Sequence, residues 1–279
     1  MDGKALAERV RAEVRAEVEQ LGELGLATVL VGDDAASEIY IRRKHEAANE
    51  VGIESLDIRL PASTTQEALE ARVAELNADP SVHGILVQLP LPAQLDEEAV
   101  IDTIDPLKDV DGLHPSNAGR LYLGRPRLVP ATPVGIMALL AAYDIELDGA
   151  TAVVIGRSNI VGKPVAQLLL RQHATVIMCH SHTRDLERET LDADVLVVAA
   201  GHAALVTPDM VKHGSTVIDV GMNRAESGLV GDVDPEAMEL AGHMTPEPGG
   251  VGPMTIACLL RNTVQAARLQ RPVLEIRSA

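Results

Sequence analysis

The stretch "AVVIGRSNIVGKPVAQLLL" (Ala152–Leu170) decides the fold of the second half of this 279-residue chain. An apolar run ends at Gly156, and a helical pattern begins near Gly162. A glycine between strand and helix is typical of dinucleotide-binding βα units, because the helix N-terminus presents its N–H groups to a pyrophosphate. Ser158 stands where the Gly-x-Gly-x-x-Gly fingerprint has its second glycine, so the motif alone is equally compatible with an ordinary βα turn.

The end of the next predicted strand, "ATVIMCHSHT" (174–183), carries no acidic residue for a ribose. Ser181 lies there between His180 and His182, and Arg157 is available from the glycine turn. An acid would repel a 2′-phosphate, so its absence favours NADP over NAD. The two histidines also suggest a metal site, but no carboxylate or cysteine completes it, and a solvated strand end is the favoured alternative.

Strand-like and helix-like patterns alternate along the chain, which predicts an α/β fold with mostly parallel sheets. We expect two α/β domains flanking a cleft, the C-terminal one Rossmann-like. The predicted ranges are 1–130, joined by a C-terminal helix at about 264–279, and 131–263. Residues 105–133 are rich in Pro, Gly and Asp and predict functional loops.

Composition excludes several classes of function. The charges sum to 24 − 41 = −17, which disfavours nucleic acid and anionic membranes as partners. Cys179 and Cys258 are too few for a disulfide framework or a zinc site, and no metal is expected. The first 21 residues alternate charge on an amphipathic helix and lack the apolar core of a signal peptide. We therefore expect a soluble, cytoplasmic protein.

Tyr40 is one of only three tyrosines in a chain without Phe or Trp, and it precedes Lys44 by four residues. On a helix this spacing places the phenol and the amine on one face. In isolation a solvated helix is the more common explanation. Gln88 at a strand end, Asp111 in "KDVDG" and the loop "PGGVGPMT" (248–255) change that balance, because open α/β sheets bind ligands beyond their strand C-termini.

Together these residues resemble one family, the bifunctional methylenetetrahydrofolate dehydrogenase/methenyltetrahydrofolate cyclohydrolases of the FolD type. The resemblance spans nearly the whole chain, and its blocks occur in the family's order. They are "VGDDAASEIYIRRKHEAANEVGI", "GILVQLPLP", "KDVDG", "GRSNIVGKP", "VIDVGMN", "GDVD" and "PGGVGPMTIACLLRNT".

The resemblance implies a role for each matched residue. Tyr40 would pack against the aminobenzoyl ring of folate, Lys44 would be the catalytic lysine, and Gln88 would hydrogen-bond it. Asp111 would grip the amino-pyrimidine edge of the pterin, leaving Asp109 structural. The loop containing Gly250 and Pro253 would lie between nicotinamide and folate, and the NADP-binding positions would be Gly156, Arg157, Ser158, Gly162 and Ser181.

The implied chemistry is oxidation of 5,10-methylenetetrahydrofolate with NADP, followed by hydrolysis to 10-formyltetrahydrofolate. An exposed lysine has a pKa of about 10.4 and is a poor base at neutral pH. Partial burial beside a cationic substrate would lower the pKa of Lys44 and let it accept a proton. The family also implies a homodimer formed through the cofactor domains.

Two rival classes stay open: a monofunctional or unrelated two-domain NAD(P)-dependent dehydrogenase, and a non-catalytic nucleotide sensor.

Three positions depart from the family pattern. Ala131 replaces a cysteine, His182 replaces a more basic residue, and Glu247 replaces a small apolar residue and adds negative charge near the cofactor.

Overall fold

The chain divides into two compact units, each built on a parallel sheet. In the computed structural model, which describes residues 1–225 and 228–277, one unit comprises Met1–Glu8 with Thr132–Thr255, and the other comprises Arg9–Ala131 with the chain from Ile256 onward. They are called here the Thr132–Thr255 unit and the Arg9–Ala131 unit. The predicted α/β class with parallel sheets and a Rossmann-like C-terminal half is confirmed.

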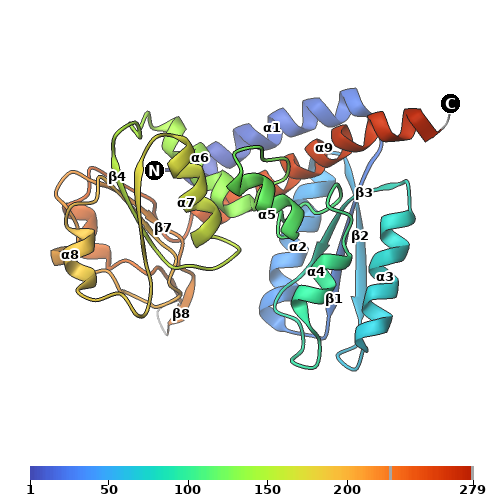
Figure 1. Cartoon of the computed structure of the whole chain (residues 1–279), viewed down its shortest axis with the longest axis horizontal. Coiled ribbons are helices and arrows are strands. Elements are labelled where there is room, and N and C mark those ends of the chain that lie inside the picture. The colour runs from blue at the N-terminus through green and yellow to red at the C-terminus, as the bar shows by residue number, and fades with distance from the viewer. Residues whose placement is uncertain (226–227, 278–279) are drawn as a thin grey trace. The chain divides into compact units, whose positions relative to one another are not determined.

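The Arg9–Ala131 unit contains a three-stranded sheet of order β2-β1-β3, with β1 (Leu24–Val31), β2 (Ile53–Leu60) and β3 (Val82–Val87) all parallel. Every residue of the central strand β1 is buried, and Thr28 is its one polar side chain, as is typical of a parallel strand covered on both faces. Helices α2 (Ala35–Glu50) and α3 (Gln66–Ala78) cover opposite faces of this sheet (Figure 1).

Local sequence signals explain the limits of α3. Thr65 caps its N-terminus, and the Thr65 hydroxyl accepts a hydrogen bond from the Ala68 amide at 3.3 Å. At the other end the ammonium of Lys108 donates to the carbonyls of Leu76 and Asp79, at 3.0 and 2.7 Å. Lys108 is 5% exposed, so a cation satisfies the carbonyls at the end of α3 and fixes the start of the "KDVDG" segment.

The prediction of loops throughout 105–133 is wrong for residues 115–122, which form helix α5 (Pro115–Tyr122), and for residues 131–133, which begin helix α6 (Ala131–Ala142). The helix starts because Pro115 occupies its first turn and the ring of His114 accepts a hydrogen bond from the Ser116 amide at 3.0 Å. The remaining helices that contribute to this unit are α1 (Gly3–Leu21), α4 (Glu97–Thr103) and α9 (Val251–Arg277). Within the unit Arg268 of α9 pairs with Glu17 of α1 at 2.9 Å.

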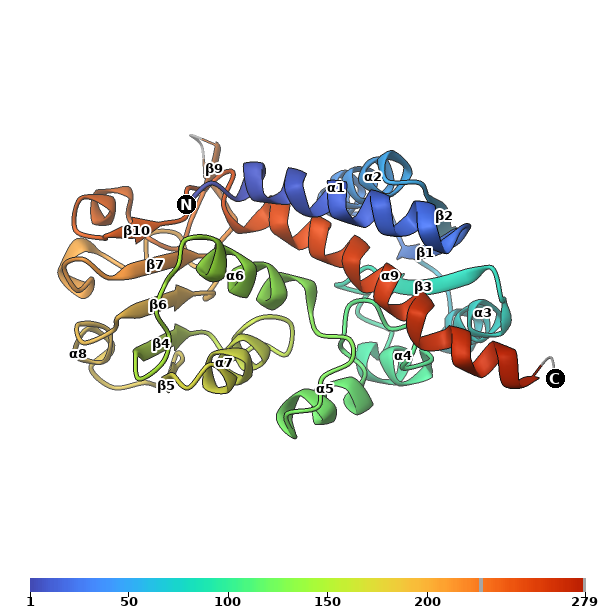
Figure 2. The same cartoon turned by 90° about the horizontal axis from the view of Figure 1, so that it is seen from above.

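The Thr132–Thr255 unit contains a five-stranded parallel sheet of order β10-β7-β6-β4-β5 (Figure 2). Its strands are β4 (Thr151–Ile155), β5 (Thr175–Cys179), β6 (Val195–Val198), β7 (Thr216–Asp219) and β10 (His243–Met244). The chain leaves β4 to form β5 on one side and later returns to form β6 on the other. The carboxyl end of β4 is therefore the topological switch point, where doubly wound sheets bind ligands.

The longer of the remaining elements in this unit are helices α6 and α7 (Gly162–Arg171); the others are short. Helices α6 (Ala131–Ala142), α7 (Gly162–Arg171) and α8 (Leu186–Thr190) accompany the 3₁₀ turns η1 (Pro208–Met210) and η2 (Pro235–Glu239) and the antiparallel pair β8 (Asn223–Ala225) and β9 (Gly228–Val230). Helix α7 buries its apolar face, and it begins at Gly162, where the sequence predicts the helix of the βα unit.

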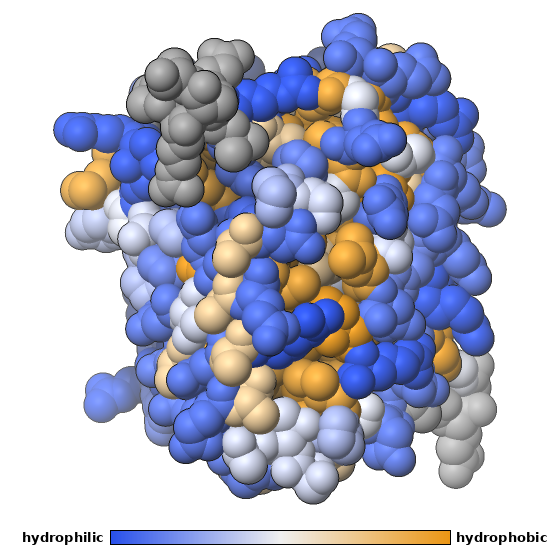
Figure 3. Space-filling model, turned by 90° about the vertical axis from the view of Figure 1, so that its right-hand side faces the viewer, coloured by the Kyte–Doolittle hydropathy of each residue, from blue (hydrophilic) through white to orange (hydrophobic). Residues whose placement is uncertain are grey.

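On the side that carries β2 and α3 in Figure 1, a strip of hydrophobic side chains lies between hydrophilic borders (Figure 3). Strips of this kind are common on folded domains, because there is too little polar surface to cover them. Among the described residues no helix is both long and apolar enough to cross a bilayer.

Candidate active site

Helix α2 and the end of strand β3 bring a lysine amine and a glutamine amide together. Lys44 is 8% exposed, and its Nζ donates to Oε1 of Gln88 at 3.0 Å. The Gln88 Nε2 donates to the Leu89 carbonyl at 2.7 Å, which orients the amide so that its oxygen faces Lys44. The Gln88 backbone N–H donates to the Val29 carbonyl at 2.9 Å, so the sheet itself holds this residue.

Tyr40 lies one helical turn before Lys44 on α2. The Lys44 Nζ is 5.9 Å from the centroid of its ring, and the tyrosine is half-buried. At this distance a protonated amine makes a cation–π contact with the ring. Whether or not the amine is protonated, the two side chains lie on the same face of α2. The ring and the amine therefore border the same space.

The two aspartates of "KDVDG" have different environments. Asp109 is 1% exposed, and its carboxylate accepts hydrogen bonds from the Leu113 amide at 3.2 Å, the His114 amide at 2.9 Å and the Asn117 side chain at 2.8 Å. Asp109 thus fixes the turn that leads into α5. For Asp111, by contrast, no hydrogen bond from the described residues is found, so its oxygens are available to a ligand.

Gly112 follows Asp111 because no other residue fits there. Its φ is +68°, and a Cβ at this position would lie 2.6 Å from the carbonyl carbon of Val129. Buried Asn262 of α9 donates to the carbonyls of Val110 and Val129, both at 2.8 Å. These contacts hold Asp111 in place. Asn262, Asn117 and Lys108 are positioning residues that the sequence did not reveal. The partners of Asn262 and Lys108 are distant in the chain, and those of Asn117 lie across the turn that Asp109 fixes.

Burial shifts the pKa of Lys44 and of Asp111, two groups whose charges act on each other. Burial lowers the pKa of Lys44, with the charge of Asp111 opposing the change. Burial raises the pKa of Asp111, and the Lys44 charge opposes it. In both cases desolvation of the charged form is the larger effect. Burial therefore makes the Lys44 ammonium easier to deprotonate than that of an exposed lysine, and a substrate cation would act in the same direction.

The glycine turn after β4 has the close backbone contacts of a phosphate-binding loop. A Cβ on Gly156, whose φ is +118°, would lie 2.2 Å from the Ala199 carbonyl oxygen. A Cβ on Gly162 would lie 2.1 Å from the Gly156 carbonyl oxygen. The Ser158 hydroxyl accepts a hydrogen bond from the Val161 amide at 3.1 Å, at the start of α7. The turn thus fits a pyrophosphate beside the helix N-terminus.

The end of β5 lies directly beside this turn, because the Gly156 amide donates to the Cys179 carbonyl at 2.9 Å. Ser181, His182 and Arg157 are exposed at this edge. The His182 amide donates to the ring of His180 at 3.1 Å, so the strand end folds back as a tight turn. Hydroxyl, imidazole and guanidinium groups at this position fit a 2′-phosphate better than a bare ribose.

The two remaining predicted residues lie at the start of α9 within the Thr132–Thr255 unit. Gly250 is buried, and a Cβ there would lie 2.6 Å from the Pro246 carbonyl oxygen. Pro253 occupies the first turn of α9, where its missing N–H costs nothing. These residues belong with the cofactor turn, whereas Tyr40, Lys44, Gln88 and Asp111 belong to the Arg9–Ala131 unit.

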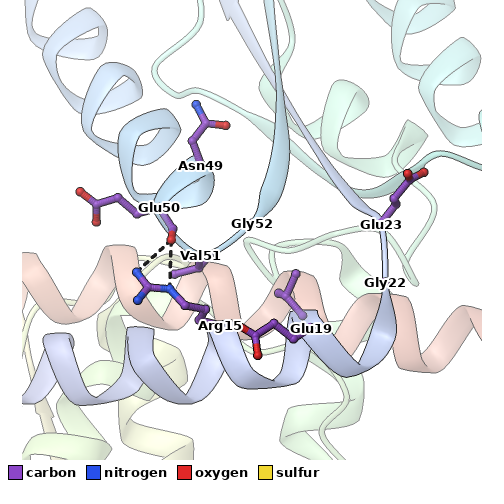
Figure 4. A pocket seen from close by; sticks show the side chains of 9 residues that line it. Arg15, Glu19, Gly22, Glu23, Asn49, Glu50, Val51 and Gly52 are labelled. Atoms are coloured by element: carbon purple, nitrogen blue, oxygen red, sulfur yellow. Dashed lines mark hydrogen bonds between the residues drawn. The ribbon is translucent and has the colours of Figure 1, made fainter.

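A surface pocket of about 500 Å³ lies elsewhere in the Arg9–Ala131 unit, between α1 and the carboxyl end of α2 (Figure 4). Arg15 spans it and donates to the Glu50 carbonyl at 3.1 and 2.9 Å. Three glutamates, at positions 19, 23 and 50, line it. This acidic pocket contains no predicted site residue and does not suit an anionic folate.

Family models match both halves of the chain. The tetrahydrofolate dehydrogenase/cyclohydrolase catalytic domain matches residues 1–111, and the tetrahydrofolate dehydrogenase/cyclohydrolase NAD(P)-binding domain matches residues 130–271. The chain belongs to the tetrahydrofolate dehydrogenase/cyclohydrolase family. The resemblance drawn from the sequence motifs is thereby confirmed.

Individual relatives of this family are similar over nearly the full length. Bifunctional protein FolD of Sorangium cellulosum is 58% identical over 275 residues, covering 96% of each chain. The crystal structure of the bifunctional FolD enzyme of Campylobacter jejuni superposes with a TM-score of 0.95 at 49% identity, covering 96% of this chain and 98% of that one. The Trypanosoma brucei FolD structure, complexed with NADP cofactor and an inhibitor, has a TM-score of 0.93 at 39% identity and covers 97% of each chain.

Proposed function

We propose that this chain oxidises 5,10-methylenetetrahydrofolate with NADP and hydrolyses the resulting 5,10-methenyl cation to 10-formyltetrahydrofolate. Family membership over both halves supports the two activities. The observation that carries the mechanism is the buried Lys44 amine held by the uncharged amide of Gln88.

Oxidation requires positioning more than acid–base chemistry. Bound NADP would supply the hydride acceptor. Gly156 and Gly162 would leave room for its pyrophosphate. The Ser158 hydroxyl accepts from the Val161 amide and orders the turn before α7, and Arg157 and Ser181 would bind the 2′-phosphate. The absence of an acid at the end of β5 is the reason for preferring NADP to NAD.

Hydrolysis is assigned to Lys44. A neutral amine has two N–H groups and one lone pair; one N–H is given to Gln88 Oε1, and the lone pair can accept a proton from the attacking water. Because burial lowers the pKa of Lys44, a larger fraction is neutral at physiological pH than for an exposed lysine. The resulting ammonium can then return the proton to the leaving ring nitrogen as the C–N bond breaks, while the hydroxyl of the adduct loses its proton to solvent and becomes the formyl oxygen.

Substrate orientation is assigned to Asp111 and Tyr40. The carboxylate of Asp111 has two acceptor oxygens for the paired donors of an amino-pyrimidine edge. Those donors would stabilise its ionised form and offset the effect of burial on its pKa. The half-buried ring of Tyr40 offers a flat apolar surface beside the Lys44 amine, which suits the aminobenzoyl ring.

An absorbance assay with 5,10-methylenetetrahydrofolate tests the function directly. The proposal predicts NADPH formation together with the 10-formyl product. NADPH with accumulation of the methenyl species identifies a monofunctional dehydrogenase. Neither product, with NADP bound, identifies a nucleotide sensor, and turnover of a different alcohol substrate identifies another dehydrogenase.

We further propose that the chain is a cytoplasmic homodimer formed through the cofactor-binding unit. Strand β5 is an edge of the sheet; its own Met178 is 36% exposed, and Leu170 of α7 is 55% exposed. Both cysteines are buried and unpaired, as is usual in a reducing compartment. Light scattering at micromolar concentration distinguishes a dimer from a monomer.

A further inference from the structure

The loop after β10 brings a carboxylate, Glu247, to the carboxyl edge of the five-stranded sheet. Thr245 fastens the start of this loop to β7: its amide donates to the Val217 carbonyl at 3.1 Å, and its hydroxyl accepts from the Asp219 amide at 2.8 Å. Glu247 follows two residues later. It therefore lies beyond the strand ends, on the edge where doubly wound sheets bind nucleotides.

The far end of the loop is fastened as well. The Gly249 carbonyl accepts a hydrogen bond from the Lys4 amide at 3.1 Å, and Gly249 has a φ of +111°. A Cβ on Gly3 would lie 1.8 Å from the Gly250 carbonyl oxygen, so the N-terminal residues pack directly on the loop. With both ends fixed, the Glu247 backbone has little freedom to carry its side chain away.

The charge that acts on Glu247 is that of another carboxylate, Asp219. Among the described residues no hydrogen bond or ion pair to Glu247 is found, and the residue is partly buried. Burial, with a smaller contribution from the charge of Asp219, raises the pKa of Glu247 to about 7. The Asp219 oxygens are already occupied by the amides of Gly221, Asp232 and Val233 at 2.9–3.0 Å.

The other charged groups around the loop form no ion pair with Glu247 among the described residues. The Met1 ammonium, the cation bound at the start of the loop, donates to the Met244 carbonyl at 2.5 Å, three residues before Glu247. Asp232 is fully buried and accepts from the Ala200 and Gly201 amides at 2.7 and 2.8 Å. Lys4, Asp2 and His243 are exposed, and the His243 ring contacts Tyr143. The edge therefore carries three carboxyl groups, of which Glu247 alone has no donor within the described part of the chain.

We propose, on the basis of the NADP-dependent function proposed above, that Glu247 sets the cofactor preference of this site by favouring the oxidised nicotinamide, whose ring is a cation, over the neutral reduced ring. The two cofactor forms share every other group, including the 2′-phosphate. A nearby carboxylate attracts only the oxidised form, and the cation in turn compensates a carboxylate that the protein leaves unpaired.

The test compares dissociation constants for NADP⁺ and NADPH by calorimetry at pH 6.0 and pH 8.5. The ratio of the two constants is the relevant quantity, because effects of pH on 2′-phosphate recognition cancel in it. Glu247→Gln removes the charge at nearly constant shape. Glu239→Gln, an exposed carboxylate on η2 of the same unit, is the matched control.

At pH 8.5 Glu247→Gln is expected to weaken NADP⁺ relative to NADPH by roughly fivefold, as a single charge at short range implies. At pH 6.0, where Glu247 is mostly protonated, the effect should largely vanish, and Glu239→Gln should change nothing. The unmodified protein provides an independent check: its preference for NADP⁺ should strengthen from pH 6.0 to pH 8.5.

Equal ratios for the unmodified protein and Glu247→Gln at pH 8.5 would overturn the inference, as would an equal effect of Glu239→Gln. Should the variant fail to fold, a ratio in the unmodified protein that does not change with pH would overturn it alone. If neither nucleotide binds the unmodified protein, the proposed function itself fails.

Discussion

The amine of Lys44 donates to the amide oxygen of Gln88 at 3.0 Å, in a position where the lysine is 8% exposed. The partner of a buried amine decides how strongly its protonated form is held. A carboxylate would stabilise the ammonium, whereas the amide orients the group and leaves it free to lose its proton.

Gln88→Glu is therefore expected to raise the pKa of Lys44 and to slow hydrolysis at neutral pH. Because the neutral amine is the active form, the rate rises with pH through the pKa of Lys44, which lies below the ordinary value in the unmodified protein. The variant should move that rise to higher pH. A pH–rate profile of methenyl hydrolysis measures the shift; superimposable profiles would contradict it.

Asp111→Asn and Asp109→Asn should affect different properties. The first removes a charged acceptor that the protein leaves unused, so the folate KM is expected to rise about 10-fold or more while the free energy of unfolding is unchanged or increased. The second weakens a three-donor turn and should lower the free energy of unfolding by about 1–3 kcal/mol. Urea titration measures the free energy of unfolding, and steady-state kinetics measure the folate KM. A stability loss for Asp111→Asn together with a raised KM for a stable Asp109→Asn would contradict the proposed roles.

Ser181→Asp is expected to change the cofactor preference. A carboxylate at the end of β5 repels a 2′-phosphate and accepts from a 2′-hydroxyl, so the ratio of kcat/KM for NADP to that for NAD should fall by at least about tenfold. Ser181→Asn, which has the same shape without the charge, is the control. A ratio that both variants leave intact would place the 2′-phosphate elsewhere.

Gly156→Ala should destabilise the Thr132–Thr255 unit, because the new Cβ would lie 2.2 Å from the Ala199 oxygen at a φ of +118°. We expect a loss of roughly 1–3 kcal/mol of unfolding free energy together with weakened NADP binding. Gly119→Ala on α5 is the matched control, since a Cβ there meets nothing within 4 Å. Thermal unfolding measures the stability of both variants. Equal stability losses for Gly156→Ala and Gly119→Ala would contradict the destabilising effect of a Cβ at position 156.

Much of the architecture followed from the sequence, because strong local patterns carry it. The mainly apolar sequence of β1 is typical of a buried strand, and the hydroxyl residues before Gln66 are typical of a helix start. Helix α5 was missed because eight residues give too short a periodic signal, and its start depends on hydrogen bonds to the His114 ring and to Asp109. The β8–β9 pair was missed for the same reason of length.

In the candidate site, too, local features could be predicted from the sequence, whereas features that depend on distant contacts could not. The spacing of Tyr40 and Lys44 predicted a shared helix face, which is a local property. The burial of Lys44 could not be predicted from "IYIRRKHEA", because the residues around it are charged and its burial arises from packing within the folded unit. The contacts of Asn262 to the "KDVDG" turn link residues more than 130 positions apart, and a single sequence contains no signal for them.

Hydrolysis of 5,10-methenyltetrahydrofolate by Lys44→Met tests the account most directly, with folate binding and the dehydrogenase reaction measured in the same preparation and Arg43→Met, an exposed neighbour on α2, as control. We predict that hydrolysis by Lys44→Met falls by roughly a hundredfold to ten-thousandfold while folate binding is largely retained. Full hydrolysis in this variant, with folate still bound, would contradict the role of the buried amine.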